Sequence, residues 1–363
     1  MTVGFFSPLP PARTGVADYS AALIEALGKV AEVRVGDPDA DICLYHLGNN
    51  PLHVEIYRQA LARPGVVVLH DAVLHHFFLG AFDQAAYIEE FVYNYGEFER
   101  GLAAQLWAAR DGSAADARYF DRALVRRIAE ASRAVVVHNP AAARIVREHA
   151  PQARVIEIPH LYAPAAPPEP DPRRWRAAHG IPAGAFLFGV FGHLRGSKRI
   201  SAILRAFDRA RSAGTRLLVA GDFVAKDLES ALAPMLGAPD VIRVPYVPEL
   251  EFQTLAAAVD ACISLHNPSA AETSGITIRL MAAGKPVLVS AGEEVVHLPD
   301  SAVIRIDRGL AEEPMLTEYM MWLVEHPENA RQIGSRAAAH IAAHHSPDLV
   351  ARRYFELLSS CCR

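Results

Sequence analysis

Short apolar runs that alternate with longer stretches of helical character are the feature that most limits the folds open to this chain. In each run Val, Ile, Leu and Phe follow one another with few polar residues between them. Such runs are typical of parallel strands covered by helices on both faces, so the sequence predicts an α/β fold. In the first half, strands are expected at residues 3–6, 31–35, 42–46, 66–69, 134–137 and 155–158. In the second half, they are expected at residues 186–191, 216–220, 241–244, 261–265, 286–289 and 302–306.

A proline-rich segment, residues 163–174, separates the two sets of strands. Its composition favours a stiff, extended linker between two domains. We expect a Rossmann-like N-terminal domain at residues 1–162 and a second one at residues 175–345. Two open parallel sheets joined by one linker are expected to face a central cleft, and ligands of such folds bind beyond the carboxyl ends of the strands.

Length and composition exclude several classes of protein. A chain of 363 residues that is 51% hydrophobic is long enough for two cores, and its net charge of −5 argues against a nucleic-acid partner. The N-terminal residues lack the pattern of a signal peptide and no apolar run is long enough for a membrane span, so a cytoplasmic protein is expected. The four cysteines form no CxxC pair and no disulfide framework, so they are expected to be inert thiols and not to form a zinc site.

Two places in the first half are candidate ligand sites. The loop after the first strand, SPLPPARTGVADYS, places Gly15 at the start of an amphipathic helix, where backbone N–H groups can approach an anion. The alternative is a loop that is merely stiffened by its prolines. His70 and Asp71 directly follow the strand at residues 66–69, and two interpretations are open. Either His70 contacts the transferred sugar, or His70 is a structural histidine beside Asp71, which caps a helix. A metal site built from His70, His75 and His76 would need a carboxylate or a fourth ligand in range, and none is expected here.

The second domain opens with a strand, a glycine-flanked basic loop and a helix at residues 200–210. The loop, FGHLRGSKR, carries Arg195, Lys198 and Arg199. A departing nucleoside diphosphate gains negative charge, and without a divalent ion the protein must supply cationic hydrogen-bond donors. The three side chains are candidates for that role, and the alternative is that they are solvated loop charges.

The passage at residues 267–286, NPSAAETSGITIRLMAAGKP, is the most informative in the chain. It runs from a strand through a turn and Glu272 into a helix entered by small residues. The amides of Thr273, Ser274, Gly275 and Ile276 are expected to be available to a phosphate, and Glu272 to accept hydrogen bonds from sugar hydroxyls. The alternative is that Glu272 only stabilises the helix N-terminus.

Taken in order, five passages of this chain resemble the retaining GT-B glycosyltransferases of family 4. They are PPARTGVADYS, VVVLHD, VIEIPH, FGHLRGSK and PSAAETSGITIRLMAAGKPVLVS, which together span nearly the whole chain. The resemblance implies that Gly15 approaches the donor phosphates and His70 lies near the reacting sugar. It also implies that Lys198 neutralises the diphosphate, that Glu272 holds hydroxyls of the donor sugar, and that the final helix, at residues 346–363, crosses back to the first domain.

Two positions depart from the pattern of that family. His193 stands where the family usually has arginine, and no acid follows eight residues after Glu272, where the family's second glutamate holds the ribose. That position is Leu280, and aligning the neighbouring motifs brings Arg279 there instead. Arg279 cannot accept hydrogen bonds from ribose hydroxyls, although its guanidinium can meet a phosphate.

Residues 83–128 have helical character and no motif that names a function. Tyr87, Phe91, Tyr95 and Phe98 recur at spacings of three and four, which predicts one buried helix face, with an acceptor-binding or lid surface as the alternative.

The function expected from these features is metal-independent, retaining transfer of a sugar from a nucleoside-diphosphate sugar, which is the substrate rather than a cofactor. The acceptor is unknown and could be a saccharide, a lipid-linked saccharide or a small molecule. The alternatives are a sugar-nucleotide epimerase or phosphorylase, and a non-catalytic protein that binds sugar nucleotides or a partner. An NAD-dependent oxidoreductase fits least, because the glycine fingerprint of a dinucleotide site is missing.

Overall fold

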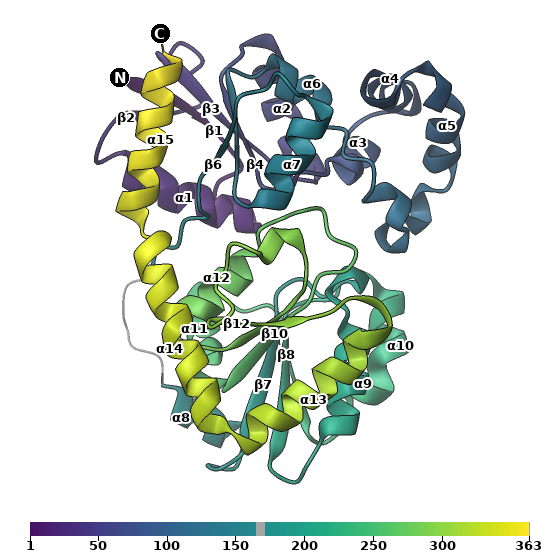
Figure 1. Cartoon of the computed structure of the whole chain (residues 1–363), viewed down its shortest axis with the longest axis vertical. Coiled ribbons are helices and arrows are strands. Elements are labelled where there is room, and N and C mark those ends of the chain that lie inside the picture. Colours follow the sequence, from purple (N-terminus) through teal and green to yellow (C-terminus); the bar gives the residue numbers. More distant parts are fainter. Residues whose placement is uncertain (165–170, 363) are drawn as a thin grey trace. The chain divides into compact units, whose positions relative to one another are not determined.

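The computed structural model describes residues 1–164 and 171–362. The chain divides into two compact units (Figure 1). The first unit contains Met1–Ala163, Pro268–Thr273 and His344–Arg363, and the second contains Pro164–Asn267 and Ser274–Ala343. A short segment from the middle of the chain is therefore grouped with the first unit.

The first unit is built on a sheet of six parallel strands in the order β2-β1-β3-β4-β5-β6. The strands are β1 (Thr2–Phe6), β2 (Glu32–Val35), β3 (Ile42–Leu47), β4 (Val66–Leu69), β5 (Ala134–Val137) and β6 (Val155–Glu157). All six strands expected in the first half are confirmed, with ends that differ by one residue at most.

Two apolar cores cover the two faces of this sheet, because alternate side chains of each strand point to opposite sides. Val66 and Val68 of β4 join one core with helices α1 (Gly15–Leu27) and α15 (Pro347–Cys361). Val67 and Leu69 join the other. The helices of that second face are α2 (Val54–Ala62), α3 (His75–Ala81), α4 (Gln84–Tyr95), α5 (Arg100–Ala108), α6 (Arg126–Ala131) and α7 (Pro140–His149).

The C-terminal helix α15 packs beside α1 in the first unit (Figure 1). Val350 and Tyr354 on its inner face are fully buried, and the hydroxyls of Tyr354 and Tyr19 lie 3.0 Å apart. Arg133 donates a hydrogen bond to the carbonyl oxygen of Cys361 at a distance of 2.7 Å. This bond holds the C-terminal end of the helix in place. The helix lies within residues 346–363, where the final helix was expected.

The aromatic stripe expected at residues 83–128 is only partly a buried face. Tyr87 and Phe91 on α4 are fully buried, and Tyr95 packs against the same core. Phe98 is fully exposed, so its inclusion in the stripe was wrong. The reason is Gly96, which ends α4 with φ +93 and turns the chain before Phe98. A spacing of three residues has no helical meaning across that turn.

The second unit contains another six-stranded parallel sheet, in the order β12-β11-β10-β7-β8-β9. Its strands are β7 (Phe186–Phe191), β8 (Thr215–Ala220), β9 (Val241–Val244), β10 (Ala261–Ser264), β11 (Val287–Ser290) and β12 (Val303–Ile306). All six expected strands are again confirmed within one residue. The order reverses between β7 and β10, and that switch point is where ligands of open α/β sheets bind.

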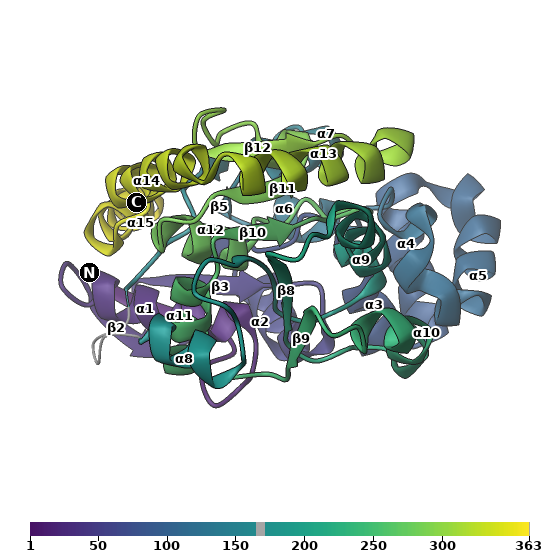
Figure 2. The same cartoon turned by 90° about the horizontal axis from the view of Figure 1, so that it is seen from below.

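Helices cover both faces of the second sheet (Figures 1 and 2). Helices α9 (Ile200–Ala210), α10 (Lys226–Leu236) and α13 (Glu312–Glu325) contribute to a core with β7, β8, β11 and β12. The other helices of this unit are α8 (Pro172–Ala178), α11 (Glu249–Ala258), α12 (Gly275–Ala282) and α14 (Pro327–His344).

The expected extended linker at residues 163–174 includes three residues that belong to the next helix. Pro172 to Arg174 form the first turn of α8, with Asp171 as the N-cap that accepts a hydrogen bond from the amide of Arg174. Proline is favoured at the first helical position, because its missing N–H has no partner there in any helix. Residues 165–170 of the expected linker lie outside the described residues.

Candidate functional site

The loops that follow β7 and β10 meet at the switch point of the second sheet. The amide of Asn267, after β10, donates to the carbonyl of Ser197, in the loop after β7, at 2.7 Å. The Ser197 loop is a short 3-10 turn, Gly196–Lys198, whose closing hydrogen bond runs from the Lys198 amide to the carbonyl of Arg195. These contacts place the basic loop beside the passage that leads into α12.

Lys198 is buried in this loop. Its Nζ atom donates to the carbonyl of Phe191, the last residue of β7, at 2.8 Å. A Cβ atom added at Gly192 would lie 2.8 Å from the same Nζ and 3.4 Å from Cγ1 of Ile276. The ammonium group, the bare Gly192 backbone and the second residue of α12 therefore surround one small volume.

The first turn of α12 completes this arrangement. Ser274 is the N-cap and its hydroxyl accepts a hydrogen bond from the amide of Thr277 at 3.2 Å. The hydroxyl of Thr277 donates to Ser264, at the end of β10, at 2.9 Å. Because the first amides of a helix have no partner within the helix, those of Gly275 and Ile276 form a positive end beside Lys198. Thr273 lies one residue before the cap, and a phosphate contact by its amide or by that of Ser274 stays a prediction.

Glu272 lies in the segment Pro268–Thr273, which is grouped with the first unit. The amide of Ala72 donates to the carbonyl of Ala270 at 3.0 Å. The side-chain amide of Asn139 donates to the carbonyl of Ala271 at 2.8 Å and to the hydroxyl of Thr273 at 2.9 Å. The chain thus leaves the second unit after Asn267 and returns to it at Ser274.

The carboxylate of Glu272 folds back on its own loop. Its Oε2 atom accepts hydrogen bonds from Ser269 Oγ at 3.1 Å and from the amide of Ala270 at 2.8 Å. Since only three peptide units separate Glu272 from Gly275, the chain holds their Cα atoms within about 11 Å. Lys198 belongs to the second unit, so a ligand shared by Lys198 and Glu272 stays a prediction.

Two of the predicted cationic residues have protein partners. Arg199 donates to Glu312 of α13 at 2.7 Å, and the carboxylate of Glu312 is buried. Arg279 pairs with Glu249 of α11, and its guanidinium lies 3.8 Å from the ring centre of Phe252. Both guanidinium groups therefore stabilise packing between helices, and any contact with a donor stays a prediction.

His193 and Arg195 lie at the surface of the same basic loop. Partial burial, and after it the charges of Lys198 and Arg195, lower the pKa of His193. The imidazole is therefore neutral at physiological pH and is not a cation. Arg195 remains the exposed guanidinium of this loop.

Replacing Gly192 with alanine tests the packing around Lys198. Gly192 has φ +95, and the new Cβ would displace the lysine Nζ. We expect a loss of about 1 kcal/mol of stability, and weaker binding of a nucleoside-diphosphate sugar. Thermal unfolding and donor titration measure the two effects. Gly196→Ala is the control, because its added Cβ meets no heavy atom within 4 Å, and equal donor affinity in both variants contradicts the prediction.

In the first unit, Gly15 is the first residue of α1, and Thr14 caps the helix by accepting from the amide of Ala17 at 3.1 Å. A Cβ atom added at Gly15 would meet no heavy atom within 4 Å, so packing does not require glycine there. Gly15→Ala is therefore expected to leave thermal stability unchanged or slightly higher. If Gly15 approaches the donor phosphates, the KM for the donor rises, and an unchanged KM rejects that role.

His70 directly follows β4 and belongs to a cluster of histidines at the carboxyl edge of the first sheet. His46 is the penultimate residue of β3, His138 follows β5 and His160 lies beyond β6. The ring of Tyr19, on α1, has these four imidazoles around it, with centroids 4.8 to 5.9 Å away. Burial first, and the neighbouring imidazoles second, lower the pKa of His70 well below 6.5.

His70 is the one member of this cluster that was predicted from the sequence as a site residue. The sequence did indicate the other members, because His46, His138 and His160 each stand at the end of a predicted strand or within two residues after it. Side chains at the carboxyl ends of parallel strands gather at one edge. The alternative interpretation, in which Asp71 caps a helix, is not observed. The carboxylate of Asp71 accepts a hydrogen bond from the amide of Asn49 at 2.9 Å, and the N-cap residue of α3 is Leu74.

Comparisons with protein-family models and with curated protein sequences gave no match. Solved structures, however, are similar to this chain over 99% of its length. A sucrose-phosphate synthase from Thermosynechococcus elongatus gives a TM-score of 0.68 at 16% identity and is covered over 98% of its own chain. The Anabaena protein HepE, in complex with UDP and glucose, gives 0.65 at 14% and is covered completely. WaaG, a glycosyltransferase involved in lipopolysaccharide biosynthesis, gives 0.61 at 15% and is covered over 99%.

These neighbours and the two six-stranded parallel sheets decide the architecture. The chain has the GT-B fold. The prediction of two Rossmann-like domains in an α/β chain is thereby confirmed. At 14 to 16% identity the similarity establishes the GT-B fold, and the activity of this chain is argued separately.

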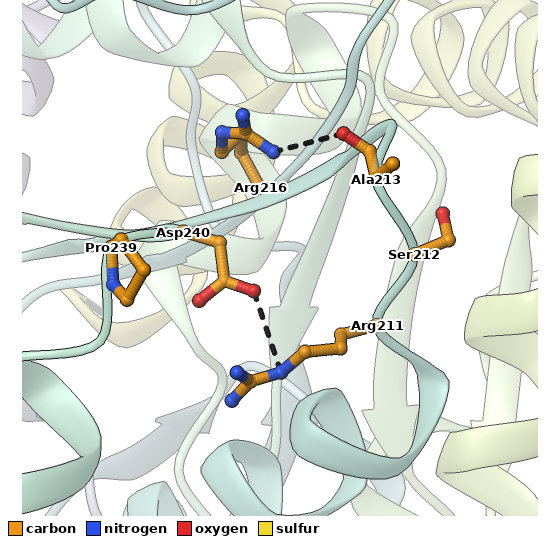
Figure 3. Close-up of a pocket in the computed structure, with 6 residues that line it drawn as sticks. All are labelled: Arg211, Ser212, Ala213, Arg216, Pro239 and Asp240. Carbon is orange, nitrogen blue, oxygen red and sulfur yellow. Dashed lines mark hydrogen bonds and ion pairs between the residues drawn. The ribbon is translucent and has the colours of Figure 1, made fainter.

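A pocket of about 420 Å³ lies elsewhere in the second unit of this GT-B fold (Figure 3). It is lined by Arg211, before β8, by Arg216, the second residue of β8, and by Asp240, just before β9. Lys198, by contrast, follows the carboxyl end of β7. Arg211 lies 3.4 Å from the carboxylate of Asp240, and Arg216 donates to the carbonyl of Ala213 at 3.3 Å. Since both guanidinium groups have protein partners, this pocket is a weak candidate for an anion.

Within residues 1–164 and 171–362, no group of three or more His, Cys, Asp or Glu side chains is arranged to hold a metal ion. Over the same ranges, no helix combines the length and the apolar character that crossing a bilayer requires.

Proposed function

We propose that this chain is a glycosyltransferase that moves a sugar from a nucleoside-diphosphate sugar to an acceptor hydroxyl. The observation that carries the proposal is the buried Lys198 ammonium beside Gly192 and the amide end of α12, at the switch point of the second sheet. That arrangement suits a diphosphate, because a fixed cation and two backbone donors meet around one space. HepE, a structural neighbour, has been solved with UDP and with UDP-glucose, which supports a nucleotide sugar as the donor.

The proposed roles follow from the chemistry of each group. Lys198 and the amides of Gly275 and Ile276 stabilise the negative charge that builds on the departing diphosphate. Glu272 accepts hydrogen bonds from hydroxyls of the donor sugar, and His70 forms a hydrogen bond with the sugar. Because the chain supplies its own cation, the proposal requires neither a divalent metal nor a cofactor.

We further propose retention of configuration, as in the family 4 enzymes that the motifs resemble. The bond between the anomeric carbon and the phosphate oxygen breaks, and the bond to the acceptor oxygen forms on the same face of the sugar. The acceptor proton passes to the departing phosphate oxygen. The diphosphate leaves as the protonated product, so no protein nucleophile is needed.

The proposal is tested by donor binding followed by product analysis. A panel of nucleoside-diphosphate sugars is screened by thermal shift, and the best donor is then incubated with a panel of acceptor alcohols in the presence of EDTA. Transfer predicts that the free nucleoside diphosphate appears only with an acceptor, and that NMR shows the anomeric configuration of the donor in the product. An epimerised nucleotide sugar, or turnover driven by inorganic phosphate, would instead identify an epimerase or phosphorylase.

One observation favours a second function, that of a non-catalytic protein that binds sugar nucleotides. Arg279 stands near the position where the resembled family has its second acid, and it is paired with Glu249. Tight donor binding without product on any acceptor of the panel would support this alternative. Turnover with one acceptor would exclude it.

A further inference from the structure

The histidine cluster of the first unit contains a hydrogen bond that bears on the role of His70. The Nδ1 atom of His46 lies 3.0 Å from the Nε2 atom of His70, and the two rings are stacked with centroids 5.3 Å apart. One of these two nitrogens carries the proton and the other accepts it. The direction of this bond decides what the opposite side of the His70 ring offers to a ligand.

Both imidazoles are neutral at physiological pH. Burial, and then the adjacent histidines, lower the pKa of His46 and of His70 well below the usual value of 6.5. A neutral imidazole has one N–H and one bare nitrogen. A state in which both facing nitrogens carry protons is therefore excluded, and only two arrangements remain.

The surroundings of His46 distinguish the two arrangements. Its other nitrogen, Nε2, is buried and has no hydrogen-bond partner among the described residues. If His46 accepted from His70, its own proton would sit on Nε2 as a buried N–H without a partner. Such orphan donors are rarer in proteins than orphan acceptors, so the proton of His46 belongs on Nδ1.

Two other histidines of the first unit, His53 and His138, show the same pattern with an unambiguous partner. His53 Nδ1 lies 2.9 Å from the carbonyl of His46, and His138 Nδ1 lies 2.9 Å from the carbonyl of Ile158. A carbonyl can only accept, so each of these imidazoles is protonated on Nδ1. Each also leaves Nε2 buried and, among the described residues, without a hydrogen-bond partner. This part of the protein thus tolerates a bare Nε2.

We propose that His46 is a positioning residue that fixes the tautomer of His70. The Nδ1–H of His46 donates to Nε2 of His70, which leaves His70 with its proton on Nδ1. The structure shows no protein partner for that Nδ1 within residues 1–164 and 171–362. His70 therefore offers a hydrogen-bond donor to an oxygen of the bound sugar, and it has no free nitrogen with which to act as a general base.

This inference rests on the proposed function only for the identity of the ligand, and the tautomer can be measured without any ligand. The protein is labelled with ¹⁵N-histidine, and long-range ¹H–¹⁵N correlation spectra are recorded at pH 7.5. The His70 signals are assigned by their loss in His70→Gln. We expect the Nδ1-protonated pattern for His70 in the wild-type protein, and finding its proton on Nε2 overturns the inference.

Variants of His46 test its role in setting that tautomer. Asparagine can place an amide donor near the position of the imidazole Nδ1, so His46→Asn is expected to keep His70 protonated on Nδ1. His46→Leu removes the donor, and His70 is expected to shift toward the Nε2-protonated form. An unchanged tautomer in His46→Leu rejects the positioning role. If His46→Leu does not fold, the wild-type spectrum and His46→Asn still decide the direction of the bond.

The tautomer also predicts which replacement of His70 retains activity. Asparagine at position 70 keeps a donor near the place of Nδ1, whereas leucine keeps none. His70→Asn should therefore retain at least tenfold more turnover than His70→Leu. Because an amide can donate a hydrogen bond but cannot act as a base, this result would support the donor role of His70. Equal loss in both variants contradicts the donor role. A protein that transfers no sugar but shows the expected tautomer disproves the proposed function and leaves the role of His46 intact.

Discussion

Lys198→Ala is expected to lower turnover with the preferred nucleoside-diphosphate sugar by about 10²-fold or more. The lysine is buried, and its Nζ atom is held 2.8 Å from the carbonyl of Phe191 beside the start of α12. Removing a fixed cation from such a place leaves the charge of the departing diphosphate to the backbone amides alone. The effect should appear in the rate of nucleoside-diphosphate release at saturating donor and acceptor.

Controls separate the charge of Lys198 from its packing. Lys198→Met keeps most of the aliphatic stem and loses the ammonium, so it should be nearly as inactive as the alanine variant while it remains folded. Lys226→Ala removes an exposed lysine from the first residue of α10 and should leave turnover unchanged. Near-normal turnover in both Lys198 variants would show that Lys198 does not act on the diphosphate.

Glu272→Gln is expected to lower turnover by a similar factor, about 10²-fold, with little loss of stability. Glutamine has one carbonyl oxygen, which can keep the hydrogen bonds from Ser269 Oγ and the amide of Ala270 that Oε2 accepts now. The second oxygen becomes an NH₂ group, which donates and can no longer accept from a sugar hydroxyl. The variant thus preserves the loop and removes the proposed sugar contact.

The matching control for this variant is Glu272→Ala, which removes both functions of the carboxylate. It should lose turnover as well, and it should also unfold at a lower temperature, because two loop hydrogen bonds each stabilise the protein by roughly 1 kcal/mol. If Glu272→Gln transfers sugar at the normal rate while Glu272→Ala is unstable, the residue only holds its loop.

The strands could be predicted from the sequence because burial on both faces leaves an apolar run wherever a parallel strand lies. All twelve strands, among them β4 and β9, were found within one residue of their ends. The loops after β7 and β10 were predicted as candidate ligand sites, but the strand order that brings them together at a switch point was not predicted. The exposure of Phe98 was missed, because the helical spacing continues across Gly96 in the sequence while the helix itself stops there.

The partners of the charged site residues could not be predicted from the sequence. Arg199 pairs with Glu312, a residue 113 positions later, and Arg279 pairs with Glu249, which is 30 positions earlier. Contacts of this kind depend on how α9, α11, α12 and α13 pack against one another, and a local sequence pattern does not predict helix packing. The grouping of Pro268–Thr273 with the first unit was equally out of reach, since it depends on the side chain of Asn139.

The position of α15 has a consequence for how the protein is made. The sheet of the first unit is synthesised first, yet one of its apolar faces is covered by Val350, Tyr354 and their neighbours, which leave the ribosome after the whole second unit. A nascent chain that has only reached the end of the second unit therefore leaves apolar side chains of α1 uncovered. Transiently exposed apolar surface of this kind favours aggregation until α15 has been synthesised and has packed against α1.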